Sequence, residues 1–341
     1  MRALLPLLAL AACSSSETPL THATSLECPA PGALPFRLST SGFQKSTNQT
    51  LASDDPRNKD QASDTLGNPS GASASVYLAD DQQPGTTAID YHGLKARTAP
   101  ANGYQSTALI SENVSLWRFD AAATAWKSLG SAKTDGNGQY DLPSTGFIAA
   151  NGEPVYAMLE ADGSCAVHYD YLLAPGSKVV VTDIDGTLTA DDGELLSQIA
   201  SITYVPKMMG AADQLMKAWA NKHYPIIYLT ARTHVLRAES RLWLDDLGFP
   251  TGPLITANGG KNDDVYKTLW LERLVQSFGW NIVAAYGNAD TDITAYENAG
   301  IAKDHTFIVG PMAGSRGTVA IANGDFTAHI SGFVASQPAN Q

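Results

Sequence analysis

The hydrophobic pattern divides the chain into two regions with different periods. From Val76 to Leu173, apolar and polar residues alternate in short runs, such as Val114–Phe119 and Val155–Leu159, with Gly, Asn and Asp between them. Alternation with a period of two is typical of half-buried strands, and frequent turn signals favour a sandwich of short strands. We therefore predict an all-β domain over residues 39–175, with an irregular N-terminal part.

From Lys178 onward, apolar runs typical of buried strands alternate with stretches of helical spacing. This alternation predicts an α/β domain over residues 176–335, with a Rossmann-like, doubly wound parallel sheet and helices on both faces. We expect the strand order 3-2-1-4-5 within this domain, and a short tail over 336–341. The expected strands cover residues 178–182, 225–229, 254–256, 282–286 and 306–309, and the expected helices cover 206–222, 236–247, 263–278 and 290–298.

Residues 39–75 are polar and rich in aspartate. A calcium loop formed by Asp54, Asp55, Asp60 and Asp64 would need a ligand spacing that these residues do not have. We therefore expect a solvated loop here. The β region as a whole offers no convergent set of ionisable residues, so we expect it to carry no chemistry.

The N-terminus has the pattern of an export signal. A short positive start precedes an apolar run from Ala3 to Leu10, and Leu10-Ala11-Ala12-Cys13 resembles a bacterial lipobox. We expect residues 1–12 to be a signal peptide, Cys13 to become a lipidated N-terminus, and residues 13–38 to form a flexible tether. An ordinary secretory signal is the alternative. The lipobox predicts an exported, membrane-anchored lipoprotein facing the periplasm or the cell surface, on the outer membrane in a Gram-negative host.

Cysteine content agrees with export. Once Cys13 is lipidated, Cys28 and Cys165 remain, and an even pair in an oxidising compartment is a candidate disulfide. Two unpaired buried thiols are the alternative.

Composition limits the classes of partner. The 341 residues carry a net charge of -12, with 44% hydrophobic and 16% charged residues. This is an ordinary globular composition, and the acidic balance argues against nucleic-acid binding. It also argues against a general attraction to anionic lipid headgroups, so an anionic ligand requires a local site.

Candidate chemistry gathers after the predicted strands. Asp183 and Asp185 follow the first strand, and Gly186 lets the chain turn away from them. Thr230 follows the second strand, Lys267 lies on the helix after the third, and Asp292 follows the fourth. Because ligands of open α/β sheets bind at the carboxyl ends of the strands, we expect these side chains to converge.

The converging carboxylates predict a magnesium-dependent phosphohydrolase. Magnesium takes hard oxygen ligands, so we expect Asp183, Asp185 and Asp292 to bind it. Asp183 is the expected nucleophile and Asp185 the expected acid/base, while Thr230 and Lys267 hold the phosphoryl oxygens. The residues expected to contact phosphate or the rest of the substrate are Gly186, Thr187, Thr230, Ala231, Arg232, Lys267 and Asn288, with Asn258-Gly259-Gly260-Lys261 as further headgroup contacts.

The four motifs, Asp183 with Asp185, Thr230, Lys267 and Asp292, resemble those of the haloacid dehalogenase superfamily of phosphohydrolases. More narrowly, Lys178 to about Phe333 resembles the lipin-type domain. This domain is the catalytic part of lipin phosphatidate phosphatases, and it is also the C-terminal domain of the membrane-associated phosphatidylinositol transfer proteins. The matching text includes Asp183-Ile184-Asp185-Gly186-Thr187, Ile226-Ile227-Tyr228-Leu229-Thr230-Ala231-Arg232, Asn281-Ile282-Val283-Ala284-Ala285-Tyr286-Gly287 and Thr306-Phe307-Ile308-Val309-Gly310.

The resemblance implies both an activity and an alternative to it. The matching segments further along the chain are closer in sequence to the transfer-protein branch. That branch lacks the nucleophilic aspartate and binds phosphatidic acid without hydrolysing it. This chain keeps Asp183, which favours an enzyme. The β region resembles the Ig-like or transthyretin-like modules of exported bacterial proteins. Lipins also pair the domain with an Ig-like sandwich, which agrees with the β region here.

Short intervals between the motifs leave little room for a large cap over the site. We therefore expect an open site that suits a bulky lipid phosphate such as phosphatidate, carried on a membrane to which Cys13 anchors the chain. The alternatives are a non-catalytic module that binds phosphatidic acid or phosphoinositide, and a phosphatase for small-molecule or protein phosphoesters.

Overall fold

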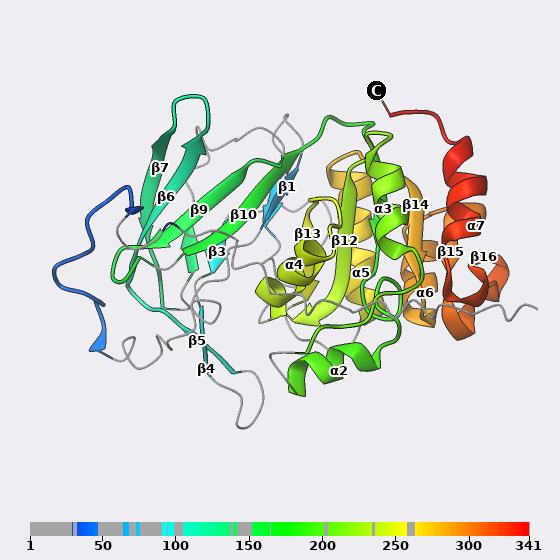
Figure 1. Cartoon of the computed structure of the whole chain (residues 1–341), viewed down its shortest axis with the longest axis horizontal. Helices are drawn as coiled ribbons and strands as arrows, with labels where there is room; N and C mark the ends of the chain where they lie inside the picture. The colour runs from blue at the N-terminus through cyan, green and yellow to red at the C-terminus, as the bar shows by residue number, and fades with distance from the viewer. Residues whose placement is uncertain are drawn as a thin grey trace, which may run out of the picture.

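The computed structural model places a β-rich part beside an α/β part (Figure 1). It describes residues 29, 33–46, 64–67, 73–75, 91–93, 95–98, 105–136, 139–141, 152–163, 165–200, 204–233, 236–257 and 263–340. The predicted signal peptide, Cys13, Cys28 and the segment Asn258 to Lys261 lie outside these residues.

The β-rich part contains one six-stranded sheet and two smaller strand pairs. The large sheet has the order β2-β1-β10-β9-β6-β7, and the small sheets are β3-β8 and β4-β5. β1 pairs with β10 in parallel, whereas the other pairings in this part are antiparallel. The strands are β1 (Thr65–Gly67), β2 (Ser73–Ser75), β3 (Tyr91–Gly93), β4 (Lys95–Thr98), β5 (Gln105–Ala108), β6 (Asn113–Asp120), β7 (Ala125–Lys133), β8 (Gln139–Asp141), β9 (Pro154–Leu159) and β10 (Cys165–Leu172).

This part has a small core of its own. Val114 and Leu116 on β6 are fully buried with Val155, Ala157 and Leu159 on β9. Their spacing follows the alternation that predicted these strands, since every second side chain of a strand faces the same side. The β character of the region is therefore confirmed, and the Ig-like arrangement stays a prediction.

The α/β part is built on a six-stranded sheet in which all pairings are parallel. Its order is β13-β12-β11-β14-β15-β16, so β11 lies between β12 and β14. The strands are β11 (Lys178–Thr182), β12 (Ile226–Thr233), β13 (Leu254–Ala257), β14 (Asn281–Gly287), β15 (Thr306–Ile308) and β16 (Val319–Ala320). The helices are α2 (Gly193–Ala200), α3 (Ala212–Ala220), α4 (Arg237–Asp246), α5 (Asp263–Glu272) continued by a π-helical turn (Arg273–Ser277), α6 (Asp290–Asn298), α7 (Thr327–His329) continued by a π-helical turn (Ile330–Val334), and short 3-10 turns at Lys303–His305, Gly310–Met312, Ser315–Gly317 and Ala322–Gly324.

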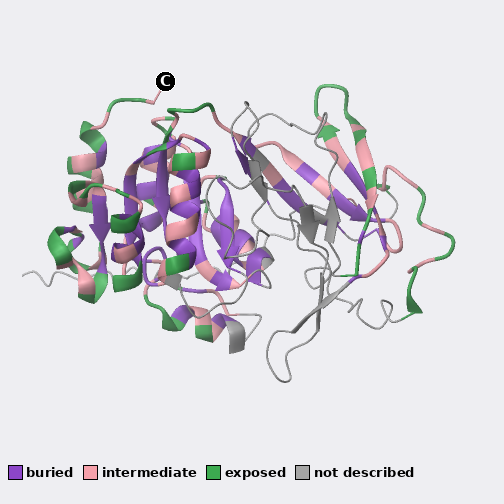
Figure 2. Ribbon diagram, turned by 180° about the vertical axis from the view of Figure 1, so that it is seen from behind, coloured by how far each residue is buried: buried purple, intermediate pink, exposed green. Residues whose placement is uncertain are grey.

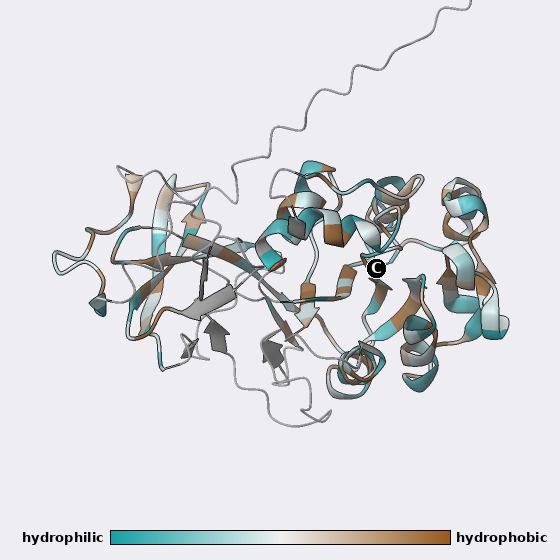
Figure 3. Cartoon of the chain, turned by 90° about the horizontal axis from the view of Figure 1, so that it is seen from below, coloured by the Kyte–Doolittle hydropathy of each residue, from teal (hydrophilic) through white to brown (hydrophobic). Residues whose placement is uncertain are grey.

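Two hydrophobic cores cover the two faces of this sheet. Val179 and Val181 pack with residues of α5 and α6, while Val180 packs with residues of α3 and α4. Consecutive residues of one strand therefore serve opposite cores, which explains why the strand is apolar throughout. Figure 2 shows buried residues running along these strands, and Figure 3 shows hydrophobic residues along the strands and hydrophilic ones on outward turns of the helices.

Two elements differ from the predicted pattern. The helix expected over 206–222 begins only at Ala212, because the preceding residues form β-bridges, Thr189 to Met208 and Gly210 to Asp325. α2 was not predicted; its eight residues lie beyond the carboxyl ends of the strands (Figure 1).

The segment expected as a tail is held against the α/β part. Asn340 donates hydrogen bonds to the carbonyls of Lys178 on β11 and of Lys222 and His223.

The junction of the two parts corrects the expectation of a solvated loop at Asp64. Asp64 is fully buried, and its carboxylate contacts Arg237 and Arg241 of α4. Leu66 of β1 is also fully buried and belongs to the core shared with Val179 and Ile227. The polar stretch therefore ends in a strand that enters the interface, and a hydrophobic pattern of three residues is too short to reveal it.

Two further expectations can be compared with the structure. Cys165 is disulfide-bonded, which agrees with the predicted role of this cysteine, while its expected partner Cys28 lies outside the described residues. Among the helices that the structure describes, none has the length and apolar character needed to cross a bilayer.

Candidate active site

Asp183 lies directly after β11, at the carboxyl end of a central strand. Its backbone N–H donates to the carbonyl of Tyr286 on β14, 3.0 Å away, so the chain is held to the sheet at this residue. Gly186 then turns the chain with φ +67, and a Cβ there would come 2.0 Å from Asn288 Nδ2. The turn therefore requires glycine both for its backbone angle and for the space.

Lys267 joins the two carboxylates that the sequence placed in different loops. Its Nζ donates to Asp183 Oδ1 at 2.7 Å and to Asp292 Oδ1 at 2.6 Å. All three side chains are buried. The predicted convergence of Asp183, Lys267 and Asp292 is present, and one ammonium group holds two carboxylates at a single point.

Burial and charge shift the proton affinities within this cluster. Burial raises the pKa of Asp183 to about 7; Lys267 opposes this shift, and the nearby carboxylates of Asp292 and Asp185 add to it. Burial alone would lower the pKa of Lys267, but the two carboxylates outweigh it and raise that pKa above its usual range. Lys267 is therefore charged at neutral pH, and a cation beside Asp183 would favour its ionised form.

Asp292 is fixed by backbone groups at the start of α6. Its Oδ2 accepts hydrogen bonds from the N–H groups of Asn288 at 3.0 Å and Ala289 at 3.1 Å. A Cβ on Gly287 would lie 2.6 Å from the Cβ of Asp292, so this approach also depends on a glycine. These contacts leave Asp292 Oδ1 directed at Lys267.

Thr187 and Asn288, expected to contact phosphate, lie beside Asp183. The Thr187 hydroxyl is 3.2 Å from Asp183 Oδ2 and 3.4 Å from Asn288 Oδ1. Asn288 Nδ2 donates to Asp192 Oδ1 at 3.0 Å. Asp192 is a member of this group that the sequence analysis missed, because it lies in the loop before α2 and belongs to no recognised motif.

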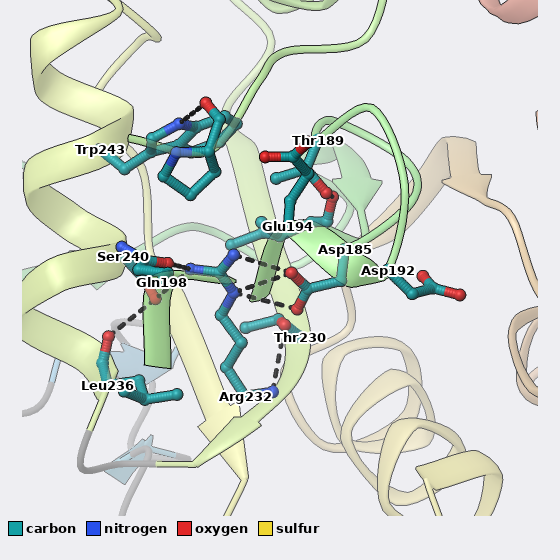
Figure 4. Close-up of polar contacts among 12 residues, drawn as sticks. Asp185, Thr189, Asp192, Glu194, Gln198, Thr230, Arg232, Leu236, Ser240 and Trp243 are labelled. Carbon is teal, nitrogen blue, oxygen red and sulfur yellow. Dashed lines mark hydrogen bonds and ion pairs between the residues drawn. The ribbon is translucent and has the colours of Figure 1, made fainter. Parts of the chain in front are cut away.

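Asp185 has a different partner from the one expected. Arg232 binds its carboxylate in a bidentate manner, with Nη2 at 2.7 Å from Oδ1 and Nε at 2.9 Å from Oδ2 (Figure 4). Arg232 Nη1 also donates to Gln198 of α2 at 3.0 Å and to Ser240 of α4 at 3.1 Å. The Arg232 side chain is 0% exposed, so it supports Asp185 and is not placed to meet a headgroup.

Thr230 lies on β12 and is fully buried, and Ala231 follows it on the same strand. The Thr230 hydroxyl accepts the backbone N–H of Arg232 at 3.2 Å. The N–H of Gly186, another expected phosphate contact, donates to the Thr189 hydroxyl at 2.9 Å. The Thr230 hydroxyl and the Gly186 N–H are therefore each fixed by a hydrogen bond within the protein.

The donor set fits magnesium through two side chains. Asp183 and Asp292 supply hard carboxylate oxygens beside each other, with one oxygen of each on the Lys267 ammonium, and Mg²⁺ commonly binds through one or two carboxylates with water and substrate phosphate. The Asp185 carboxylate, which we expected as a third ligand, is occupied by Arg232. Within the described ranges, no group of three or more His, Cys, Asp or Glu side chains gathers as a metal site.

Ser240 and Gln198 were also missed, although a signal for Ser240 existed. Arg237, Ser240 and Arg241 have the spacing i, i+3, i+4 on a predicted helix, which places them on one face. A polar face normally indicates solvent, yet all three residues are buried.

A family model described as the LNS2 domain of PITM 1-3 matches residues 180–310. These residues form an LNS2 domain. The lipin-type domain predicted from the motifs is thereby confirmed, and it contains Asp183, Arg232, Lys267 and Asp292.

Relatives of the chain carry the same domain within longer proteins. Protein retinal degeneration B of Drosophila melanogaster is 31% identical over 228 residues, which are 64% of this chain and 17% of that protein. Membrane-associated phosphatidylinositol transfer protein 3 of Homo sapiens is 27% identical over 234 residues, which are 67% of this chain and 23% of that protein. The chain therefore spans less than a quarter of the length of either relative.

Solved structures give only distant matches. A structure described as a HAD-like phosphatase from Mesorhizobium loti has 16% identity and a TM-score of 0.37, over 48% of this chain and 87% of that one. A phosphoserine phosphatase in apo form has 14% identity and a TM-score of 0.32, over 46% and 98%. These likenesses are too weak to bear on the activity of the LNS2 domain.

Proposed function

We propose that the LNS2 domain is a magnesium-dependent phosphatase that hydrolyses a phosphomonoester through an aspartyl-phosphate. The observation that carries this proposal is the convergence of Asp183 and Asp292 on Lys267, all buried at the carboxyl end of the sheet. A buried carboxylate held by a lysine beside a second carboxylate suits nucleophilic attack on phosphorus.

Each residue has a separate task in this scheme. A carboxylate oxygen of Asp183 forms a bond to phosphorus while the bond from phosphorus to the leaving oxygen breaks. Asp185 gives a proton to that leaving oxygen, then takes one from the water that hydrolyses the aspartyl-phosphate. Lys267 neutralises charge on the phosphoryl group, and Thr230 helps to orient it. Arg232 binds both oxygens of Asp185 and so fixes the orientation of this carboxylate for both proton transfers, while each oxygen keeps a further lone pair for the proton.

Asp183 and Asp292 would hold the magnesium ion. The bound ion supplies positive charge that offsets the repulsion between these carboxylates and the substrate phosphate. Each of these carboxylates has two oxygens, and both side chains are buried, which supports this assignment.

The preferred substrate is a lipid phosphate such as phosphatidate. The only helix found between Thr189 and Pro206 among the described residues is α2, of eight residues, which agrees with a site open to a bulky substrate. The matched relatives named as membrane-associated phosphatidylinositol transfer proteins also connect this domain with lipid.

A phosphate-release panel tests the proposal. The full chain is assayed with and without magnesium on micellar phosphatidate and on soluble phosphomonoesters, with Asp183→Asn as the inactive control. We expect magnesium-dependent release that is faster with phosphatidate. Faster release from soluble esters would favour a small-molecule or protein phosphatase instead.

A non-catalytic lipid-binding module is the second candidate. The relatives' names as transfer proteins favour it, while Asp183 and its contacts favour the enzyme. Vesicles containing phosphatidate separate the two functions, because binding without release of phosphate from any ester would establish the module.

We also propose that the protein is exported and anchored through lipidated Cys13. The lipobox supports this proposal, and the disulfide at Cys165 fits an oxidising compartment. Mass spectrometry of the N-terminal peptide tests it, and an unmodified Cys13 would contradict it.

A further inference from the structure

We propose that Asp64 is a positioning residue for the acid/base Asp185, acting through α4 and Arg232. The N-terminal strand β1 thus brings to the α/β sheet a carboxylate that orients one group of the active site. This inference rests on the proposed function for the role of Asp185, whereas the chain of contacts does not depend on it.

The first contacts fix α4 against the edge of the sheet. Asp64 Oδ1 lies 2.6 Å from Arg237 Nη2, and Oδ2 lies 3.0 Å from Arg241 Nη2. Oδ2 also accepts the backbone N–H of Leu254 on edge strand β13 at 2.8 Å, and Oδ1 accepts that of Tyr169 on β10 at 3.0 Å. One fully buried carboxylate therefore ties α4, the sheet edge and the β part together.

Both arginines are held on their other side as well. Arg237 Nη1 donates to the carbonyl of Leu254 at 3.3 Å, and Arg241 Nη1 donates to that of Gly252 at 2.9 Å. The guanidinium of Arg241 also lies over the ring of Tyr169, 5.2 Å from its centroid. These planar groups have fixed donor directions, so together they set the position and the rotation of α4.

Ser240 passes this position on to Arg232. It lies between Arg237 and Arg241 on the same face of α4, and its hydroxyl donates to the Leu236 carbonyl at 2.7 Å. With its proton so used, the Ser240 oxygen accepts Arg232 Nη1 at 3.1 Å (Figure 4). Arg232 then presents its other two donor nitrogens to Asp185.

The relay reaches only one of the two groups of the active site. Among the described residues, the side chains of Asp64, Ser240 and Arg232 make no hydrogen bond or ion pair with Asp183, Lys267 or Asp292. Arg232 meets the phosphoryl-binding residues only through its backbone N–H, which donates to the Thr230 hydroxyl. A disturbance at Asp64 should therefore impair proton transfer by Asp185 and spare the nucleophile. General stabilisation of the fold would make no such distinction.

The leaving group of the substrate separates these two readings. An alkyl phosphate needs a proton on its leaving oxygen, whereas 4-nitrophenyl phosphate has a stable leaving anion and depends much less on the general acid. We would measure kcat/KM, which reports the first phosphoryl transfer, for both esters in the full chain. The variants are Asp64→Asn, Ser240→Ala and, as a matched control, Glu112→Gln, which removes another buried carboxylate of the β part.

We expect Asp64→Asn to lower kcat/KM for the alkyl ester at least about tenfold more than for the aryl ester. Ser240→Ala should show the same selectivity, and it leaves the Asp64 ion pairs in place should Asp64→Asn fail to fold. Glu112→Gln should change both substrates by one common factor. A common factor for Ser240→Ala or for folded Asp64→Asn would overturn the relay.

Hydrogen exchange tests the relay without any activity. In Asp64→Asn, or in Ser240→Ala if the former does not fold, amides of residues 230–233 and 237–246 should exchange faster, with those of α6 unchanged. Equal acceleration in α6, or none in residues 230–233, would contradict the proposal. If the wild type hydrolyses no ester, the proposed function fails, while this exchange pattern still decides whether Asp64 positions Arg232.

Discussion

Two buried ion clusters in this molecule have opposite charge balance. At the active site, two carboxylates, Asp183 and Asp292, share one ammonium group, Lys267. At the junction, two guanidinium groups, Arg237 and Arg241, share one carboxylate, Asp64. Within these ion pairs alone, the first cluster has a formal excess of negative charge and the second an excess of positive charge, which the nearby carboxylate of Asp245 reduces.

This difference in charge balance distinguishes a site suited to bind a ligand from a site whose charged groups are bound by the protein itself. The junction arginines direct further donors at the carbonyls of Leu254 and Gly252, so the protein itself supplies acceptors. At the active site, the excess negative charge is suited to a divalent cation. Burial is common to both clusters, so the charge balance of the ion pairs, rather than burial, distinguishes the candidate active site from the junction.

The largest expected effect is the loss of the nucleophile. Asp183→Asn keeps the size of the side chain but removes the attacking charge, so no covalent intermediate can form. Turnover should fall by at least about 10³-fold, measured as magnesium-dependent phosphate release. Near-normal turnover in this variant would show that Asp183 is not the nucleophile.

At the junction, stability should respond more strongly than chemistry. Arg241→Met removes one partner of a buried carboxylate and should lower the free energy of unfolding by about 3–5 kcal/mol. Denaturant titration measures this change. Lys303→Ala is the control, because its pair with Glu297 is 42% exposed on both sides and is screened by solvent, so the variant should leave the free energy of unfolding nearly unchanged. Equal losses in the two variants would remove the distinction between the junction and the surface.

The negative excess of the active site predicts a defect that metal can partly repair. Asp292→Asn should weaken magnesium binding by on the order of 10-fold to 100-fold or more, because losing even an outer contact of a metal site costs that much. Phosphate release as a function of magnesium concentration tests this, and part of the activity should return at high concentration. A defect that is constant across all magnesium concentrations would assign Asp292 another role.

The smallest expected effect concerns a half-buried group outside both clusters, His329. Burial lowers the pKa of His329 from 6.5 to about 4, and its Nε2 lies 2.9 Å from the Tyr286 hydroxyl. Between these pH values the unfolded chain binds the proton and the folded chain does not, so stability is present above pH 6.5 and falls as pH drops toward 4. The loss should be about 1 kcal/mol, since the side chain is partly exposed and solvent screens it.

The variant His329→Phe isolates this contribution. Phenylalanine keeps a ring against Phe307 and Phe333, which contact His329 in the native chain. On lowering the pH from about 6.5 to 4, the unfolding free energy of the wild type should fall by about 1 kcal/mol relative to that of the variant. Parallel pH curves would show that His329 titrates normally.

The active site was predictable because its residues occupy positions that topology brings together. Asp183 and Asp292 each follow a strand of a parallel sheet, and neighbouring strands deliver them to the same edge. Arg232 shows the limit of this reasoning. Its place beside Thr230 suggested a headgroup contact, but β12 extends to Thr233, and the buried side chain binds Asp185. A motif specifies the order of residues along the chain, but it does not specify how deeply each side chain is buried.

The junction was not predictable for a related reason. Asp64 lies in a polar segment, and its partners among the described residues are far away in the sequence: Arg241 is 177 residues away and Leu254 is 190 residues away. The helix expected to begin at Pro206 instead begins at Ala212, because Met208 and Gly210 form bridges with distant segments. In each case a tertiary contact overrides the local pattern.

The burial of β1 also sets an order of events in the life of the chain. During synthesis, Asp64 and Leu66 emerge well before α4 and β13 exist, so their final environment is absent until the chain has been made as far as Ala257 of its 341 residues. The charge of Asp64 must stay hydrated during that interval, because an unpaired carboxylate is costly to bury. Contacts of such long separation form slowly. The strand β1 therefore reaches its place only when the LNS2 sheet has acquired its edge strand β13.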